Sequence, residues 1–224
     1  MLRRTLLAGP LAALLLPAPA WSHSAKTKAA AGGPAEPVAT EVGQTSGTRD
    51  AATYFTNLEL LSQDGRKLRF YADVLEGRTV MINVIYTTCK DACPLITQQL
   101  NEVRRRLPGF GKEIHFVTLT SDPQRDTPQA LKQFAQKQSA DVEGWTFLTG
   151  RKENIDHILK KLGQFSPEVE AHSTLLIAGN VPAKRWSKIR PDAPAAAIAE
   201  RLSVLAGGSG VVVPAAEATA PARP

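Results

Sequence analysis

The chain has 224 residues, of which 43% are hydrophobic and 21% are charged, and its formal net charge at pH 7 is +6. This positive excess is modest, and no aromatic residues interleave with the basic runs at 104–106 and 160–161. Because a nucleic-acid-binding surface combines clustered basic residues with such aromatics, the sequence argues against a nucleic-acid partner.

The first 20 residues have the pattern of a secretory signal peptide. Arg3 and Arg4 precede a run rich in leucine and alanine, and Ala18 and Ala20 form an A-x-A cleavage pattern. A membrane-spanning helix needs about twenty apolar residues, and this run has about eleven, so an uncleaved anchor is the weaker interpretation. We therefore expect residues 1–20 to be removed on export to a bacterial periplasm.

Two further segments have the composition of disordered chain. Residues 21–50 and 207–224 are rich in alanine, glycine and proline, and neither shows helical or strand periodicity. We expect a disordered linker and a disordered tail. The intervening residues 51–206 have the length of one domain with a full hydrophobic core.

Within this domain the predicted strands alternate with helices. The predicted elements, in chain order, are a hairpin at 58–70, a strand at 79–86, a helix from Pro94 to Leu107, a strand at 114–120, a helix capped by Thr127, a strand at 145–150, a helix at 152–163, strands at 173–179 and 185–189, and a helix at 194–206. This order predicts an α/β protein, with helices layered on a sheet.

Cys89 and Cys93, the only cysteines, follow the predicted strand 79–86 and enter the next helix. Open α/β sheets place their functional sites at this edge. Free backbone N–H groups in the first helical turn favour a thiolate at Cys93. A structural disulfide would close a loop of three residues, and short loops gain least from cross-linking. The pair is therefore either redox-active or metal-binding, and the two cysteines alone leave both possibilities open.

A histidine is the candidate for a third site residue. His23 lies in the predicted linker, and His115 and His157 are expected at a strand entrance and on a solvent-facing helix surface. His172 differs because it stands on a loop directly before the buried strand 173–179. This position in the order of elements favours a functional role.

Four segments carry recognisable motifs, namely "YTTCKDACP" (86–94), "VTLTSDPQRDTPQALKQFA" (117–135), "WTFLTG" (145–150) and "AHSTLLIAGN" (171–180). Together they resemble the Sco/SenC family of copper-binding, thioredoxin-fold proteins over about residues 54–205. The resemblance implies a thioredoxin-like α/β fold, in which a central mixed sheet is flanked by helices and extended by an N-terminal β-hairpin.

The same resemblance implies that copper is bound by Cys89, Cys93 and His172. Two thiolates with an imidazole suit Cu(I) and also hold Cu(II), whereas zinc usually takes a fourth ligand. Three positions depart from the family pattern: Lys90 stands where the family often has proline, and Ala171 and Asn180 stand where it has aspartate. A carboxylate beside a metal-bound histidine orients the ring, so its loss makes copper delivery a weaker expectation than copper binding.

Residues 121–128, "SDPQRDTP", are explained by turn and helix-capping chemistry, with Thr127 as the N-cap and Pro128 at the first helical position. Asp126 belongs to the same turn. Asp122 lies at the end of a strand on the expected site edge, and we keep it as a candidate neighbour of the metal.

The resemblance implies a non-enzymatic metallochaperone that takes copper from a donor protein. The implied recipient is a periplasmic cuproprotein such as cytochrome c oxidase subunit II. The chain would contact the membrane only through this partner. The alternative is a thiol–disulfide oxidoreductase that uses Cys89 and Cys93 as a redox-active pair to reduce the recipient's cysteines. Residues 171–174 contain no proline where thioredoxin-type reductants place a cis-proline, which favours copper.

Overall fold

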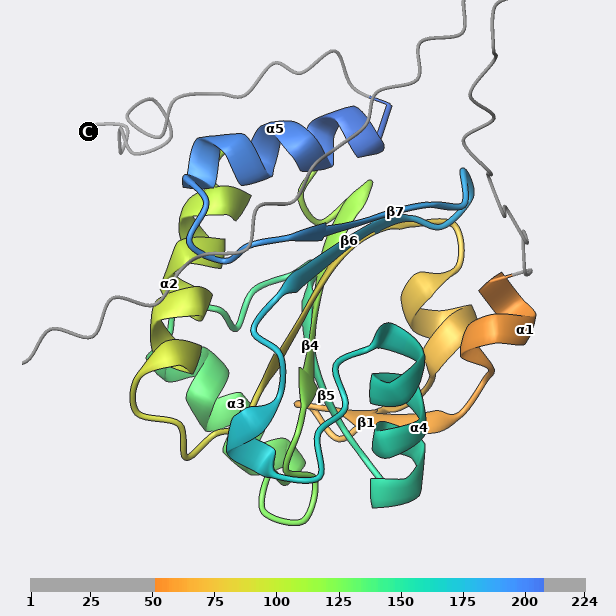
Figure 1. The fold of residues 1–224 in the computed structure, drawn as a ribbon, viewed down its shortest axis with the longest axis vertical. Helices are drawn as coiled ribbons and strands as arrows, with labels where there is room; N and C mark the ends of the chain where they lie inside the picture. Colours follow the sequence, from red (N-terminus) through yellow and green to blue (C-terminus); the bar gives the residue numbers. More distant parts are fainter. Residues whose placement is uncertain (1–50, 208–224) are drawn as a thin grey trace, which may run out of the picture. The chain divides into compact units, whose positions relative to one another are not determined.

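The computed structural model describes residues 51–207 (Figure 1). The predicted signal peptide and linker, and the predicted tail from residue 208 onward, lie outside the described residues. The strands are β1 (Glu59–Ser62), β2 (Lys67–Arg69), β3 (Thr79–Ile85), β4 (Ile114–Thr120), β5 (Trp145–Thr149), β6 (Leu176–Asn180) and β7 (Arg185–Ile189). The helices are α1 (Ala51–Phe55), α2 (Ala92–Arg104), α3 (Pro128–Lys137), α4 (Lys152–Leu162) and α5 (Ala195–Leu205), with a π-helical turn η1 (Phe70–Leu75) and a 3-10 turn η2 (Val169–Ala171).

All seven strands form one mixed sheet in the order β2-β1-β5-β4-β3-β6-β7. Strands β3, β4 and β5 are parallel, whereas β6 runs antiparallel to β3, and β7 runs antiparallel to β6. The hairpin of β1 and β2 adds to the other side through an antiparallel pairing of β1 with β5. The predicted mixed α/β sheet flanked by helices is therefore confirmed.

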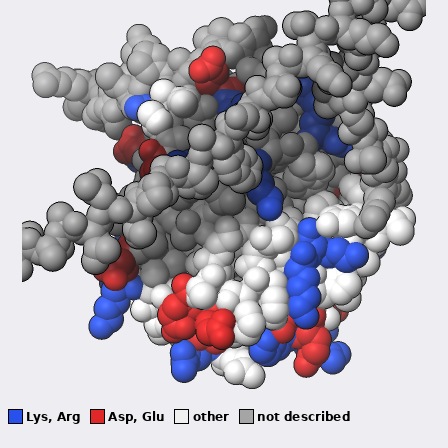
Figure 2. Space-filling model, viewed as in Figure 1, with Lys and Arg blue, Asp and Glu red and all other residues white. Residues whose placement is uncertain are grey.

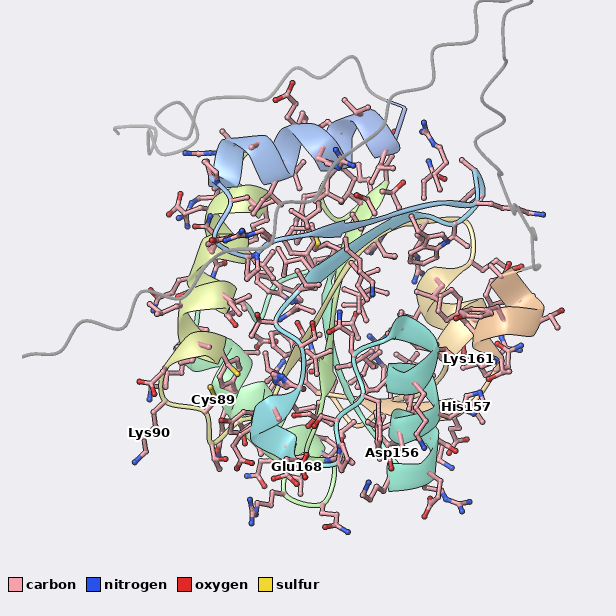
Figure 3. The ribbon with its side chains drawn as sticks, in the orientation of Figure 1. Cys89, Lys90, Asp156, His157, Lys161 and Glu168 are labelled. Carbon is pink, nitrogen blue, oxygen red and sulfur yellow. The ribbon has the colours of Figure 1, made fainter. Side chains whose placement is uncertain are left out.

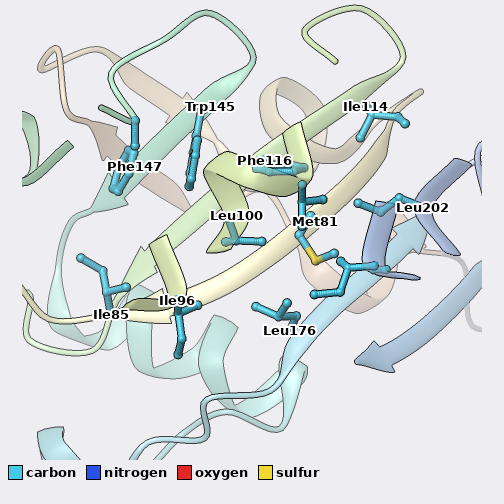
Figure 4. Close-up of a cluster of buried hydrophobic side chains, with 14 of the residues drawn as sticks. Met81, Ile85, Ile96, Leu100, Ile114, Phe116, Trp145, Phe147, Leu176 and Leu202 are labelled. Carbon is cyan, nitrogen blue, oxygen red and sulfur yellow. The ribbon is translucent and has the colours of Figure 1, made fainter. Parts of the chain in front are cut away.

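Helices cover both faces of the sheet, which explains why β3 is mostly apolar and is buried along its whole length. One hydrophobic cluster joins the sheet to α2, α3 and α5, and Figure 4 shows Met81 and Phe116 of the sheet near Leu100 of α2 and Leu202 of α5. A second cluster joins the opposite face to α1, η1 and α4. Figure 1 shows α2 and α3 on one side of the sheet and α1 and α4 on the other.

The predicted helix boundaries follow from local backbone chemistry. The Thr127 hydroxyl accepts a hydrogen bond from the Ala130 N–H at 3.2 Å, and Pro128 takes the first helical position of α3. Helix α4 ends at Gly163, whose φ of +67° lies in the left-handed region that glycine adopts without strain. Helix α2 begins at Ala92, two residues before the predicted start at Pro94.

Strand β6 begins at Leu176 and not at residue 173 as predicted. The Ser173 hydroxyl accepts a hydrogen bond from the Leu175 N–H at 3.3 Å, which makes a local turn and keeps this segment out of the sheet. Helix α1 and the turn η1 were not predicted, because runs of five and six residues are too short to show a period.

The described surface carries both signs of charge. On the face shown in Figure 2, described acidic and basic side chains lie intermingled. Within residues 51–207, no helix combines the length and the apolar character needed to cross a membrane.

Candidate metal centre

The cysteine pair lies where β3 gives way to α2. Strand β3 ends at Ile85, and a short loop carries Cys89 to the start of α2, where Cys93 is the second helical residue. Figure 3 shows Cys89 and Lys90 at this end of α2. Cys89 is half-buried and Cys93 is 2% exposed, and both thiols are free. The Cys93 N–H donates a hydrogen bond to the Cys89 sulfur at 3.3 Å.

The two thiols differ in their tendency to ionise. Burial opposes ionisation of Cys89, but hydrogen bonds to its sulfur outweigh burial and bring the pKa of this thiol below its ordinary value. The donors are the Cys93 thiol, the backbone N–H groups of Cys93 and Asp91, and the Tyr86 hydroxyl. Burial, together with the hydrogen bond to Cys89, raises the pKa of Cys93 to about 12. Ionisation is thus easier at Cys89 than at Cys93. The expectation of a thiolate at Cys93 is wrong, because burial of this thiol outweighs the effect of the helix N-terminus.

Tyr86 follows β3 directly and contacts both cysteines. Its carbonyl oxygen accepts a hydrogen bond from the Cys89 N–H at 3.1 Å. Its own backbone N–H donates to the Cys93 sulfur, and its hydroxyl hydrogen-bonds Cys89. Burial and the bond to Cys89 raise the pKa of Tyr86 to about 12, so the hydroxyl keeps its proton and acts as a donor.

His172 lies on the loop before β6, at the same edge of the sheet as the cysteines. Strands β3 and β6 are antiparallel, with Ile82 opposite Ile177, so the end of β3 and the start of β6 meet at one edge. The His172 ring packs edge-on against the Tyr86 ring, with 5.8 Å between the ring centroids and 70° between the planes. The predicted facing loop is therefore found, and Tyr86 stands in contact with residues from both segments.

The environment of His172 favours the neutral imidazole. The residue is 8% exposed, and neither ring nitrogen has a hydrogen-bond partner among residues 51–207. Burial lowers the pKa of the ring below its ordinary value. A neutral ring with unpaired nitrogens is the form that binds a metal ion, because a ligand nitrogen must be unprotonated.

The three predicted ligands share one edge of the sheet but do not surround a common point. Within the described part of the chain, no group of three or more His, Cys, Asp or Glu side chains lies close enough together to hold a metal ion. Joint binding by Cys89, Cys93 and His172 therefore requires the loops that carry them to approach one another. Both loops are short segments between regular elements, and such segments move most easily.

Asp126 fixes the loop that carries Cys89. Its buried carboxylate accepts hydrogen bonds from the Thr87 N–H at 3.1 and 3.2 Å and from the hydroxyls of Thr87 and Thr120 at 2.5 Å. Burial raises the pKa of this carboxyl, although the hydrogen bonds oppose the shift. The motif around Asp126 therefore does more than cap α3, because it also ties the end of β3 to the end of β4.

The remaining polar candidates serve other contacts. Asp122 is buried and pairs with Arg125 at 3.2 Å, in agreement with the turn chemistry expected of this segment. His157 is exposed on α4, as predicted (Figure 3). His115 is half-buried, and its Nε2 lies 3.1 Å from the Lys112 carbonyl oxygen.

Sequence reasoning missed Tyr86 and the second role of Asp126. One signal was available for Tyr86, since an aromatic residue with a polar tip ends an otherwise fully apolar strand three residues before Cys89. For Asp126 the capping pattern gave a sufficient local explanation, and the contact with Thr87 depends on the parallel pairing of β3 with β4. Local patterns do not report such a contact.

Comparison with known proteins shows which family the chain matches. The family model described as SCO1/SenC matches residues 46–179. The SCO1 protein homolog of Bacillus subtilis is 28% identical over 89 residues, which are 40% of this chain and 45% of that protein. The match thus spans about half the length of that curated relative.

Two solved structures share the fold. ScoI of Bradyrhizobium japonicum, solved with copper bound, gives a TM-score of 0.55 at 20% identity and covers 66% of this chain and 96% of that chain. The structure of BsSco, described as having a disulfide switch and as a member of the Sco family of cytochrome c oxidase assembly proteins, gives 0.58 at 20% identity and covers 68% and 93%. Because the family model spans more than half of the 224 residues and the fold agrees, the chain belongs to the SCO1/SenC family.

Proposed function

We propose that this chain binds copper through Cys89, Cys93 and His172 and acts as a metallochaperone in the assembly of a copper centre of the cytochrome c oxidase type. The observation that carries the proposal is the buried, neutral His172, whose two ring nitrogens have no partner within residues 51–207, at the sheet edge that also holds the two thiols. Buried polar atoms almost always have a partner, so an unpaired pair of nitrogens calls for a ligand.

The chemistry of the three residues fits copper. Two sulfurs and one imidazole nitrogen suit Cu(I) and also hold Cu(II). The lowered pKa of Cys89 favours the thiolate that binds a metal, whereas Cys93, with a pKa of about 12, must lose its proton when the metal binds. Copper binding therefore releases a proton from Cys93, and copper affinity should rise with pH. Family membership supports this assignment, and the fold neighbour from Bradyrhizobium japonicum has copper bound.

The proposed setting is a bacterial periplasm, reached after removal of residues 1–20. Residues 51–206 form the working domain, and 21–50 and 207–224 are its linker and tail. The proposed partners are a copper donor protein and a recipient such as cytochrome c oxidase subunit II, through which the chain meets the membrane. The description of BsSco as a member of a family of oxidase assembly proteins supports this choice of recipient.

A second candidate function rests on the difference between the two thiols. A partly exposed Cys89 with a lowered pKa, beside a buried Cys93 with a raised pKa, is the arrangement in which one sulfur attacks a disulfide and the other resolves the mixed disulfide. The alternative is thus a thiol–disulfide oxidoreductase that reduces the cysteines of the copper recipient. Both functions use Cys89 and Cys93, so only His172 separates them.

His172→Ala tests the proposal, with His157→Ala as the control because His157 is exposed on α4. In a copper titration of the reduced proteins, His172→Ala should lose Cu(II) affinity sharply, and Cu(I) affinity should change less because two thiolates still hold Cu(I). With copper limiting and a reductant supplied, His172→Ala should fail to load the recipient while thiol–disulfide exchange persists. Normal loading by His172→Ala would contradict the metallochaperone proposal and favour the oxidoreductase.

A further inference from the structure

Tyr86 touches each of the three residues in the proposed copper site. Its hydroxyl hydrogen-bonds Cys89, its backbone N–H donates to the Cys93 sulfur, and its ring packs edge-on against His172. The site is otherwise divided between two loops, one after β3 and one before β6. The Tyr86 side chain contacts residues of both loops beside the two thiols.

Core packing explains only the ring of Tyr86. The ring is half-buried against the hydrophobic cluster that contains Cys93, and a phenylalanine ring would fill the same space. The hydroxyl is not explained in this way, because it interacts with the Cys89 thiol. A hydroxyl that donates to a thiolate fixes the direction of the sulfur lone pairs and withdraws electron density from the sulfur.

We propose that Tyr86 is a positioning residue of the copper site, whose hydroxyl orients the Cys89 sulfur and whose ring holds the His172 imidazole beside the thiol pair. The inference rests on the proposed function. It adds to the three proposed ligands, Cys89, Cys93 and His172, a further residue that orients them without binding the metal. Because Cu(II) uses all three ligands and Cu(I) can be held by two thiolates, the ring of Tyr86 should matter more for Cu(II) than for Cu(I).

Two substitutions separate the hydroxyl from the ring. Tyr86→Phe removes only the hydroxyl and keeps the packing, and Tyr86→Leu removes the ring as well. Tyr54→Phe is the matched control, because the Tyr54 hydroxyl bonds the Lys161 carbonyl oxygen at 2.8 Å, in the hydrophobic cluster on the opposite face of the sheet. The readouts are the His172 ring resonances of the full-length metal-free protein by NMR and the thiolate-to-Cu(II) charge-transfer band after copper addition.

In Tyr86→Phe the His172 resonances should stay in place, while the charge-transfer band moves to longer wavelength because the sulfur has lost a hydrogen-bond donor. In Tyr86→Leu the His172 resonances should also move, because the neighbouring ring current is gone. Cu(II) affinity should then fall about tenfold, the upper range for loss of an edge-to-face pair, with Cu(I) affinity nearly unchanged. Tyr54→Phe should change neither readout.

An unmoved band in Tyr86→Phe together with unmoved His172 resonances in Tyr86→Leu would reduce Tyr86 to a packing residue and overturn the proposal. A wild-type protein that binds no copper would instead remove the proposed function. In that case the metal-free resonances of His172 would still decide whether Tyr86 holds this ring. Failure of the inference and failure of the proposed function are therefore distinguishable.

Discussion

His172, the proposed imidazole ligand, differs from an ordinary loop histidine in its surroundings. The sequence places it on a loop, where substitution costs little stability, but in the structure the side chain is buried and both ring nitrogens are unpaired within the described residues. Burying a polar atom without a partner costs free energy that packing of the ring offsets only in part. Without copper, therefore, His172 should reduce the stability of the fold that carries it.

We expect His172→Phe to raise the free energy of unfolding of the metal-free protein by about 1 kcal/mol, because the ring contact with Tyr86 remains and the unpaired nitrogens are gone. The measurement is urea denaturation, with His157→Phe on the exposed face of α4 as the control. Cu(II) affinity should fall sharply in the same variant, whereas Cu(I) affinity should change less because two thiolates still hold Cu(I). A loss of more than 1 kcal/mol would contradict the view that these nitrogens are unsatisfied.

The pH dependence of stability should change in the same variant. Burial lowers the pKa of His172 below its ordinary value of 6.5, so the unfolded chain binds this proton more readily than the folded one. The wild type should lose stability as the pH falls below about 6.5, toward the lower pKa of the folded state. His115, whose pKa is also lowered by burial, contributes in the same direction, so His172→Phe should reduce the slope without removing it. An unchanged slope in denaturation curves between pH 7 and pH 5 would count against this assignment.

At the scale of elements, the loop between β3 and α2 is held by the carboxylate of Asp126, which lies on the connection between β4 and α3. Asp126 accepts the Thr87 N–H and the hydroxyls of Thr87 and Thr120, and these contacts fix the backbone directly before Cys89. The segment before His172 is tied to the same edge, because the Ser121 hydroxyl lies 3.3 Å from both the Ile85 and the Val169 carbonyl oxygens.

Asp126→Ala should therefore cost roughly 2–4 kcal/mol of unfolding free energy, because it leaves the half-buried N–H and hydroxyl of Thr87 and the buried hydroxyl of Thr120 without their acceptor. The control is Asp156→Ala, which removes an ion pair with Lys152 on the surface of α4 and should cost less than about 1 kcal/mol. Urea denaturation of both variants is the measurement. Similar small losses would mean that Asp126 does not hold the loop.

The elements were predictable where one local pattern dominates. Mostly apolar runs predicted β3 and β4, and Thr127 and Gly163 marked a helix start and a helix end. The short α1 and η1 were not predicted because they contain too few residues to show a hydrophobic period. The order of strands, with β6 beside β3, depends on pairing between distant segments, and no local spacing encodes it.

The candidate site was predictable as a set of residues but not as an arrangement. The motifs gave Cys89, Cys93 and His172, and the element order gave one sheet edge. Three features follow from packing between separate segments: the contact of Tyr86 with His172, the difference in pKa between the two thiols, and the hydrogen bonds between Asp126 and Thr87. Such contacts require the three-dimensional structure.

For the whole molecule, the sheet provides a rigid base and the site lies on connections at its edge. Hydrophobic clusters on both faces fix β3, β4 and β6 and so bring the cysteine loop and the histidine loop together. Within residues 51–207, the proposed ligands lie at the same edge of the sheet, but no three of them lie close enough together to hold a metal ion. Under the proposed function, small movements of the two loops would let the site take up copper and release it to another protein.

The most direct test of the central claim is X-ray absorption spectroscopy at the copper edge of the Cu(II)-loaded protein, compared with His172→Ala. The wild type should show two sulfur ligands and one imidazole, and His172→Ala should keep the sulfurs and lose the imidazole signal. An imidazole signal that persists unchanged in His172→Ala, or a wild-type spectrum without sulfur, would contradict the assignment of Cys89, Cys93 and His172 as the copper ligands.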